Sequence, residues 1–445
     1  MIDLLRLDTL TPTSTHAGTL NMTFIIKDPD AKNFNYTLDS SSVALVSLVD
    51  KLFEETSLNR QVHKKGLKLI LINLIVFKGS KVLITLNNNF KGVPRYTAID
   101  VGVNAIRTVI KELQKAEYIH FIKGKILPYN SRIRSSIQAT STLNSLLEPI
   151  ILQLAPSELV LLRGDELDGS KKLIDYTDTP RTLRVRQELT AYNGLLGSVN
   201  IELRDPSGLS ILKDLNHQIV QRKFIDTGEV DIQGRLLFNS GGRSYSAWSS
   251  LSGSAERPHI FIDRQPTIEL DYQASAINVI YRALTGAVYA GDPYALSVRG
   301  VKVPRHLVKA VATTSLNSKT VKGTSTTVGS IYGELATSRK VENLAKYNQY
   351  QSIKKKVKIK DILEAFLIKH SPIRHMFLRG KEVGNKVQCL ESDLVFAVVN
   401  ELTNRSIPTL TVHDSFIVKA SDKDTLDTLM TTTGFPDQDL VKGLI

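Results

Sequence analysis

Cysteine is almost absent from this chain of 445 residues, which contains only Cys389. A single thiol excludes an internal disulfide and a cysteine-rich zinc site, so we expect a reducing compartment. No run approaches the roughly 20 apolar residues of a membrane span. The first residues, with an early aspartate and no long apolar core, are not typical of a secretory signal. These absences predict a cytoplasmic protein with no membrane partner.

Acidic residues are outnumbered, since 57 Lys and Arg face 44 Asp and Glu and give a net charge of +13. Such a balance favours polyanionic partners and salt-sensitive binding, although many unrelated proteins share it. With 42% hydrophobic residues, the chain can bury large cores and should divide into two or three domains.

Two aspartates stand at the ends of strand-like runs. Thr411-Val-His-Asp-Ser-Phe-Ile-Val418 predicts a hairpin with Asp414 in its turn, and Asp271 closes the apolar run Thr267–Tyr272 before a helical pattern. Carboxylates on neighbouring strand ends can hold Mg²⁺ together with substrate phosphates, which suggests nucleotidyl transfer by two metals. Alternatively, Asp271 caps the following helix and the His-Asp pair only forms a turn.

A third pattern lies between the aspartates. Arg305 and Lys309 open a predicted helix, and residues four apart share one helix face, so the two cations present a clamp for a polyphosphate. The same spacing also occurs on many solvated helices.

The order of these segments resembles motifs A, B and C of the superfamily that joins family A DNA polymerases to single-subunit bacteriophage and mitochondrial RNA polymerases. The segments are 269–286, 305–309 and 412–416. The resemblance implies a right-hand core of palm, fingers and thumb. It implies that Asp271 and Asp414 bind two Mg²⁺ ions, or Mn²⁺ in their place. Arg305 and Lys309 would then contact the incoming triphosphate, with Lys309 as general acid to the departing pyrophosphate.

Asn239-Ser-Gly-Gly-Arg-Ser-Tyr245 is similar to the Gly-Arg-x-Tyr element that precedes motif A in the single-subunit RNA polymerases and grips the template duplex. Arg243 offers a fork for a phosphate and Tyr245 a ring for stacking. By the same resemblance, His413 bonds the primer end or its phosphate. The alternative is a glycine turn with a surface arginine.

Two positions depart from the DNA polymerase pattern. Ala276 stands where family A DNA polymerases carry a glutamate that blocks the ribose 2′-hydroxyl, so ribonucleotides should fit. The Tyr-Gly pair expected eight residues after Lys309 is replaced by Asn317-Ser318. Asn317 is either a hydrogen-bond partner of a sugar hydroxyl or simply a polar helix residue.

The N-terminal third predicts a separate module. Residues 1–50 form a lead with a strand at 22–27, and residues 51–130 follow the outline of a winged helix. Its helix at 103–116 has Arg107, Lys111 and Lys115 on one face, suited to a DNA groove. A structural helix with a solvated basic face explains the pattern equally well.

The remaining chain predicts a mostly helical linking or thumb-like region at 131–230 and the palm and fingers at 231–445. Within the latter we expect a mobile loop at 315–330, a phosphate contact by the lysines of Lys354–Lys360, and a helix at 387–400. Glu391 and Asp393 on that helix are candidate neighbours of the site.

These patterns predict an α/β (α+β) polymerase core with a winged-helix-like module. The expected function is a compact DNA-dependent RNA polymerase or primase, encoded by a phage or mobile element and acting in the bacterial cytoplasm or nucleoid. Its partners would be a DNA template, nucleoside triphosphates, the nascent strand and an accessory protein. A family A-like DNA polymerase and a DNA-binding replication or regulatory protein with a degenerate palm are the alternatives.

Overall fold

The chain folds as a mixed α/β protein, which confirms the predicted class. In the computed structural model, 49% of the chain is helical and 18% lies in strands. Its elements form two compact units, and most of the lead predicted at 1–50, with the strand at 22–27, lies outside the described residues. The structure describes residues 31–36, 38–86, 93–97, 99–126, 132–152, 154, 158–165, 171–216, 219–338, 341–435 and 441.

The first unit comprises Met1–Leu161, Asp165–Asp175 and His217–Ile219. It contains a sheet in the order β1-β2-β6-β3, in which β1 and β2 run parallel and the other pairs antiparallel. Its described helices and strands are β1 (Lys32–Asn33), α1 (Val43–Glu55), α2 (Gln61–Val76), β2 (Val82–Ile84), α3 (Val103–Lys115), β3 (Ile119–Ile122), the paired β4 (Lys125–Ile126) and β5 (Arg132–Ile133), β6 (Ser135–Ala139) and α4 (Ser141–Leu147).

Helix α3 confirms the amphipathic helix predicted at 103–116. Ile106, Ile110 and Leu113 are buried in the core of the unit, where they pack with residues of α1 and α2. The apolar spacing of three and four residues therefore faces inward, as the helical period requires. The basic residues are left on the outer face.

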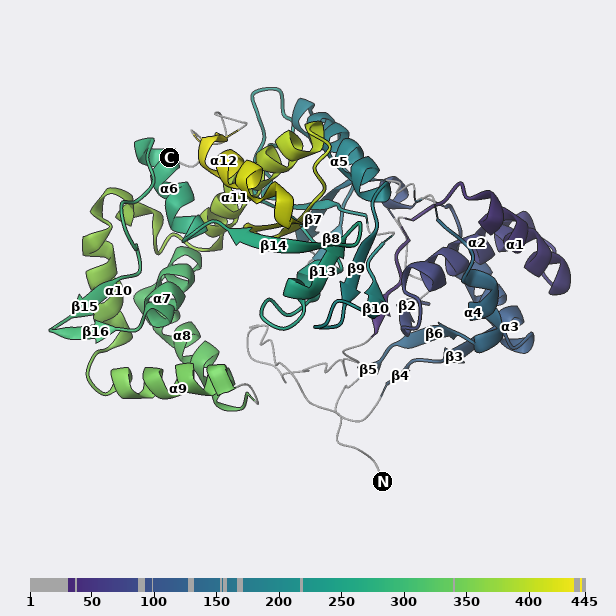
Figure 1. The fold of residues 1–445 in the computed structure, drawn as a ribbon, viewed down its shortest axis with the longest axis horizontal. Helices are drawn as coiled ribbons and strands as arrows, with labels where there is room; N and C mark the ends of the chain where they lie inside the picture. Colours follow the sequence, from purple (N-terminus) through teal and green to yellow (C-terminus); the bar gives the residue numbers. More distant parts are fainter. Residues whose placement is uncertain are drawn as a thin grey trace. The chain divides into compact units, whose positions relative to one another are not determined.

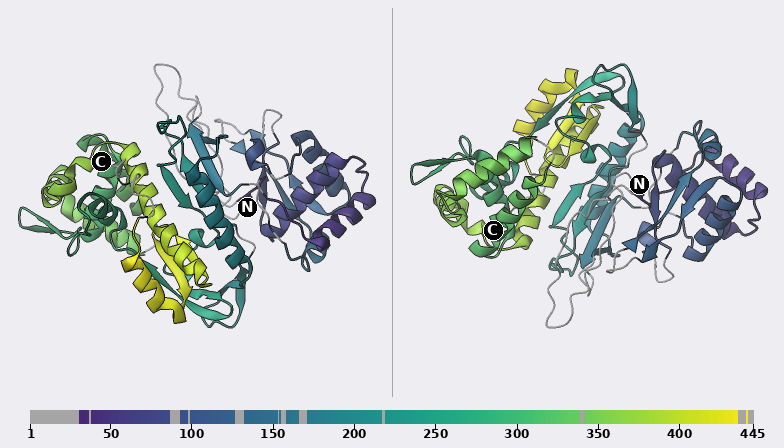
Figure 2. Two further views of the ribbon diagram at one scale, coloured as in Figure 1. Left: turned by 90° about the horizontal axis from the view of Figure 1, so that it is seen from above. Right: turned by 90° about the horizontal axis from the view of Figure 1, so that it is seen from below.

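The second unit comprises Leu162–Gly164, Tyr176–Asn216 and Val220–Ile445. Its main sheet has six strands in the order β10-β9-β13-β14-β18-β17, with all neighbours antiparallel. Helix α11 packs on α5, β12 and β17 (Figure 2). The strands are β9 (Ile201–Arg204), β10 (Ile211–Asp214), β13 (Ile260–Ile262), β14 (Gln265–Asp271), β17 (Thr409–Val412) and β18 (Ser415–Lys419), with β11 (Arg222–Ile225) and β12 (Gly241–Ser244) as a further antiparallel pair.

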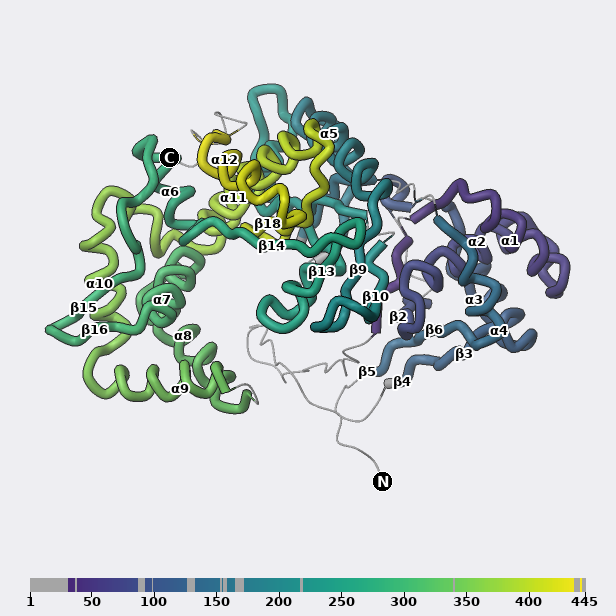
Figure 3. Tube along the Cα trace, viewed as in Figure 1, coloured from purple at the N-terminus to yellow at the C-terminus, as the bar shows by residue number. Residues whose placement is uncertain are grey.

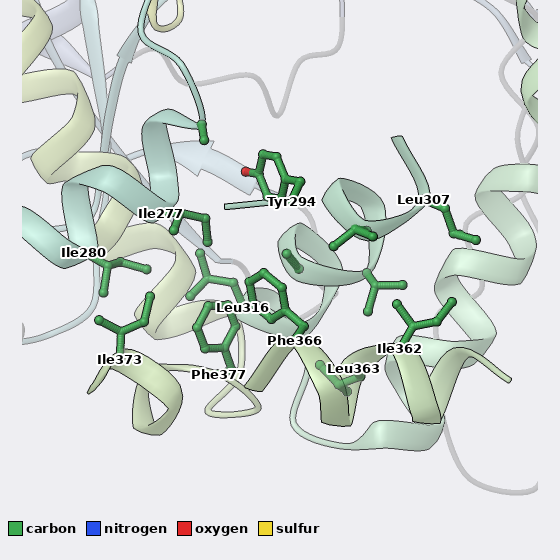
Figure 4. Packing of buried hydrophobic residues seen from close by; sticks show 14 of the residues in the cluster. Ile277, Ile280, Tyr294, Leu307, Leu316, Ile362, Leu363, Phe366, Ile373 and Phe377 are labelled. Atoms are coloured by element: carbon green, nitrogen blue, oxygen red, sulfur yellow. The ribbon is translucent and has the colours of Figure 1, made fainter. Parts of the chain in front are cut away.

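A helical cluster follows β14 in the second unit (Figure 1). Its side chains share one apolar core, in which Ile277 of α6 and Leu307 of α7 pack with Phe366 of α10 (Figure 4). The α-helices of the unit are α5 (Pro180–Gly197), α6 (Ser275–Thr285), α7 (Arg305–Asn317), α8 (Val321–Ala336), α9 (Val341–Lys354), α10 (Ile359–Lys369), α11 (Lys381–Asn404) and α12 (Lys423–Thr432), and β15 (Leu296–Val298) pairs with β16 (Val301–Val303).

The expectation of a mostly helical segment at 131–230 is wrong. Among the described residues of this segment, α4 and α5 are the only α-helices, and the other elements are β-strands, including β7 (Val160–Asp165), β8 (Lys171–Leu173) and the β9–β10 hairpin. The Asp205 carboxylate accepts hydrogen bonds from Ser207 Oγ and the Leu209 amide and so closes the hairpin turn. This local turn and the strand that follows it replace the helix suggested by the apolar pattern at 209–223.

The mobile loop expected at 315–330 is also wrong, because the segment contains the end of α7 and most of α8. The Thr320 side chain caps α8 by accepting a hydrogen bond of 2.9 Å from the Gly323 amide. Val328 and Tyr332 are buried in the helical core. A cap and two apolar anchors outweigh the low helix propensity of Ser, Thr and Gly.

Candidate active site

Strands β14 and β18, far apart in the sequence, lie side by side in the sheet (Figure 3) and bring Asp271 and Asp414 together. Strand β14 pairs with β18, and Asp271 lies opposite Ser415 in this register. The Tyr272 amide donates a hydrogen bond of 3.2 Å to the Asp414 carbonyl oxygen. Both aspartates are therefore at the same end of adjacent central strands.

The predicted hairpin that carries Asp414 is confirmed. Val412 of β17 pairs with Ser415 of β18, so His413 and Asp414 are the two turn residues. His413 adopts a left-handed φ of 57°, which fits a tight hairpin turn. Since β17 is fully buried, the turn is fixed to the centre of the unit.

Asp414 lies among several charged groups. Burial and the Glu391 carboxylate raise the pKa of Asp414 to about 6, against the lowering effect of Arg243 and Lys309. These four side chains come from the β17–β18 turn, α11, β12 and α7 respectively. An acid with so high a pKa gains strongly from a cation that binds it in its ionised form.

Neighbouring acidic residues are neutralised by arginines, whereas Asp271 and Asp414 are not. Arg257 forks onto Glu269 of β14 at 2.8 and 2.9 Å, and Arg243 binds Glu391. Neither aspartate forms an ion pair within the described part of the chain. The two strand-end carboxylates are thus the ones left open.

Oxygen donors of this kind suit Mg²⁺, which usually takes one or two carboxylates and completes its shell with water and substrate phosphates. The described residues hold no group of three or more His, Cys, Asp or Glu poised around one point. Asp271 and Asp414 therefore fit the role of metal ligands if water or a bound substrate supplies the remaining oxygens.

Helix α7 presents the two predicted cations on its exposed side. Arg305 and Lys309 both face solvent, and Lys309 is near enough to lower the pKa of Asp414. Arg305 binds the Asp292 carboxylate at 2.9 Å and lies 5.1 Å from the centre of the Tyr294 ring. Lys309 thus lies closest to the aspartates, with Arg305 one turn away.

Tyr294 is a site residue that the sequence reasoning missed. Burial raises its pKa to about 12; Arg305 lowers this pKa, and Asp414 and Glu391 raise it further. Tyr294 is therefore within electrostatic range of both the cation clamp and the carboxylates. The Asp-Pro-Tyr turn before β15 carries no motif that distinguishes it from an ordinary turn.

Strand β12 brings Arg243 and Tyr245 to the hairpin turn. The Ser244 hydroxyl hydrogen-bonds to that of Thr411 at 3.1 Å, and the Tyr245 ring meets the His413 ring edge-on at 6.2 Å. Burial and Arg243 lower the pKa of His413. The three residues predicted to contact the template or primer therefore lie beside Asp414.

The glycines of this segment are required by the fold. Gly241 and Gly242 have φ values of 78° and 79°, and a Cβ on Gly242 would come within 2.9 Å of the Arg222 side chain. These glycines lie in strand β12 and not in a turn, and the strand sets Arg243 against α11.

Ala276 and Asn317 are less directly placed. Ala276 lies in the first turn of α6 and packs against the helical core. Asn317 ends α7, where its side chain donates to the Thr313 carbonyl at 2.9 Å and closely approaches Gly384 of α11. Asn317 thus has a helix-packing role, and sugar contacts by either residue stay predictions.

Asp393, the other candidate neighbour on α11, is fully engaged elsewhere. It binds Arg181 at 2.8 Å and Arg222 at 2.7 Å. Burial alone would raise its pKa, but the two arginines hold this pKa below its ordinary value. This buried triad joins α5, β11 and α11 and leaves Glu391 as the α11 acid that faces the site.

The basic residues of α3 belong to the first unit. Arg107 is committed within the fold, because it donates to the Leu86 carbonyl and to Asn104. Lys111 and Lys115 are exposed. The predicted basic stripe is thereby reduced to two free lysines.

Among the described residues, none of the helices is both long and apolar enough to cross a bilayer. No protein family model, curated protein or solved structure matches this chain.

Proposed function

We propose that this protein is a template-directed nucleotidyltransferase, most specifically a compact DNA-dependent RNA polymerase or primase. The observation that carries the proposal is the pair of unpaired carboxylates, Asp271 and Asp414, on adjacent strand ends, with Lys309 of α7 within electrostatic range of Asp414. In this proposal β14, β17 and β18 form the palm, and α7–α10 form the fingers.

The reaction joins a 3′-hydroxyl to the α-phosphate of a nucleoside triphosphate and releases pyrophosphate. Two Mg²⁺ ions, when bound, would activate the attacking oxygen and stabilise the leaving one. Asp271 and Asp414 hold these ions. Lys309 donates a proton to the departing pyrophosphate, and its charge stabilises the negative charge that develops there.

The other residues bind and orient the substrates. Arg305 exchanges its exposed partner Asp292 for a phosphate, which costs little because exposed ion pairs contribute at most about 1 kcal/mol. Arg243 and Tyr245 contact the template duplex beside the turn, and His413 contacts the primer end. Asp292 then keeps the Tyr294 amide as its hydrogen-bond donor.

Ala276 admits ribonucleotides in this proposal. It follows Asp271 by five residues and begins the helix that leads away from the carboxylates. A methyl group there leaves room for a 2′-hydroxyl that a glutamate would exclude. A family A-like DNA polymerase is the alternative if the sugar is selected by other residues.

The test is Mg²⁺-dependent extension on single-stranded DNA, with radiolabelled ribonucleotides or deoxyribonucleotides and with or without a primer. Asp271→Asn and Asp414→Asn should each lower the rate by about 100-fold or more, since metal coordination contributes several kcal/mol to transition-state stabilisation. Asp424→Asn, at a fully exposed carboxylate on α12, is the matched control.

Ribonucleotide products made without a primer support an RNA polymerase or primase. Deoxyribonucleotide products that require a primer support the DNA polymerase alternative. Folded Asp271→Asn and Asp414→Asn variants with normal rates would contradict the proposed site. A protein that binds DNA but incorporates neither nucleotide under any of these conditions would support the DNA-binding alternative.

A further inference from the structure

Glu391 is a buried acid in the middle of the candidate site. Its side chain is 5% exposed and binds the Arg243 guanidinium. The Glu391 charge also acts on His413, Asp414 and Tyr294. Glu391 is thus near the metal-binding candidate Asp414 but is itself paired with an arginine.

Arg243 has unused hydrogen-bonding capacity at this place. One terminal nitrogen, Nη2, binds Glu391, whereas Nε is buried without a hydrogen-bond partner among the described residues. The guanidinium is also near enough to Asp414 to act on its charge. A buried arginine donor without a partner favours the nearest open carboxylate.

Arg243 cannot move far from Asp414, because its strand is fixed at this place. Ser244 hydrogen-bonds to Thr411, and the indole of Trp248 donates to the Thr411 carbonyl at 3.0 Å. The backbone thus holds the guanidinium, which is paired with Glu391, near the turn that carries Asp414. If Arg243 pairs with Glu391, the Asp414 carboxylate has no arginine partner and can bind a cation.

We propose that Glu391 is a positioning residue that holds the Arg243 guanidinium away from Asp414, so that this carboxylate remains open to a divalent cation. The inference rests on the proposed function, because it presumes a metal at Asp271 and Asp414. Glu391 itself is occupied by Arg243 and supplies no metal ligand. Its loss would let Arg243 close onto Asp414 and compete with the cation.

The test is a Mn²⁺ titration of the full chain, with free Mn²⁺ followed by electron paramagnetic resonance. Glu391→Gln should weaken Mn²⁺ binding by about tenfold, the effect typical of groups that position metal ligands. The double variant Glu391→Gln/Arg243→Gln, which removes the competing cation as well, should bind Mn²⁺ nearly as the wild type does. A crystal structure of metal-free Glu391→Gln should place the Arg243 guanidinium in hydrogen-bond contact with Asp414.

Unchanged Mn²⁺ binding in Glu391→Gln overturns the inference and leaves the metal site intact. An Arg243 side chain that keeps its position in the Glu391→Gln crystal structure overturns it too. If the wild type binds no Mn²⁺, or if Asp271→Asn binds Mn²⁺ as tightly as the wild type does, the metal site of the proposed function is wrong. The inference is then overturned together with it. Should Glu391→Gln alone fail to fold, the double variant still allows a test, because two glutamines have the same net charge as the Arg243–Glu391 pair.

Discussion

Asp414 is a side chain whose own charge destabilises the metal-free fold. Its pKa is raised to about 6 by burial and Glu391, whereas an exposed aspartate ionises near 4. The folded protein therefore binds this proton more tightly than the unfolded chain does. Stability contributed by the protonated form is present below about pH 4 and is lost as the pH rises towards 6.

Asp414→Asn should accordingly stabilise the metal-free protein at pH 8, by up to about 2 kcal/mol after allowance for solvent screening. At pH 4 the gain should shrink to a fraction of that value. Urea unfolding in the presence of EDTA at both pH values measures this difference, with Asp424→Asn as the exposed control. A variant that is less stable than the wild type at pH 8 would show that burial of the Asp414 charge does not destabilise the fold.

Strained backbone conformations also occur near the two aspartates. His413 precedes Asp414 with a φ of 57°, and Ala274 adopts a φ of 50° three residues after Asp271. Left-handed backbone costs a non-glycine residue roughly 1 to 2 kcal/mol. Such residues persist where the surrounding structure enforces them and are concentrated at functional sites. The two strained positions flank the two open carboxylates.

At the scale of elements, the buried triad of Arg181, Arg222 and Asp393 joins a helix, a strand and the long helix α11. Asp393→Asn would remove the buried carboxylate that Arg181 and Arg222 share. We expect this change to cost about 3 to 5 kcal/mol of unfolding free energy. The pKa of Asp393 is depressed, so its contribution is present above about pH 4 and is lost at lower pH.

The midpoint of urea unfolding at pH 7 measures that cost. Asp178→Asn is a suitable control. Asp178 forms a partly exposed ion pair with Arg186, which is on α5 as Arg181 is. Its substitution should cost less than about 1 kcal/mol of unfolding free energy. Equal effects of the two substitutions would show that the buried triad contributes no more than a surface pair.

The lysine turn, Lys354–Lys360, joins α9 to α10. Its five lysines are exposed, while Val357 between them is buried and anchors the turn to the helical core. Lys355→Gln/Lys356→Gln/Lys358→Gln should lower the slope of log binding constant against log salt by about 2 to 3 for duplex DNA, roughly 0.9 per lost phosphate contact. Fluorescence anisotropy with a labelled duplex measures the slope.

A control with the same loss of charge is Lys302→Gln/Lys381→Gln/Lys423→Gln, whose lysines are exposed on β16, α11 and α12. Its slope should change by less than about 1. If both triple variants change the slope equally, the lysines act only through net charge, and the lysine turn is a solvated surface.

Elements with strong local signals could be predicted from the sequence. The β17–β18 hairpin, the strand that ends at Asp271 and helix α3 follow from apolar periodicity and turn residues. Helix α8 and the β9–β10 hairpin were missed, because a capping hydroxyl and an Asp205 turn decided them. Tyr294 and the pairing of Glu391 with Arg243 depend on side chains from distant segments, which no local pattern encodes.

At the scale of the whole molecule, each of the two units contains an apolar core of its own. Leu69 and Leu113 belong to the core of the first unit, and Leu307 and Phe366 belong to that of the helical cluster in the second. All the residues proposed for catalysis lie in the second unit, whereas Lys111 and Lys115 lie in the first. A contribution of α3 to template binding should therefore be separable from the chemistry by substitution.

Lys111→Gln/Lys115→Gln tests this separation. If α3 contacts the DNA backbone, the double variant should raise the KM for the template several-fold and lower the salt slope of binding by about 2. The kcat at saturating template should stay unchanged, because uniform binding is lost and no group at the reacting atoms is altered. Steady-state extension with Mg²⁺ at several template concentrations measures both constants.

The control is Lys51→Gln/Lys65→Gln, on α1 and α2 of the same unit, which removes the same charge elsewhere. An equal rise in KM in this control would reduce α3 to a structural helix with a solvated basic face, and a fall in kcat would contradict the division of labour between the two units.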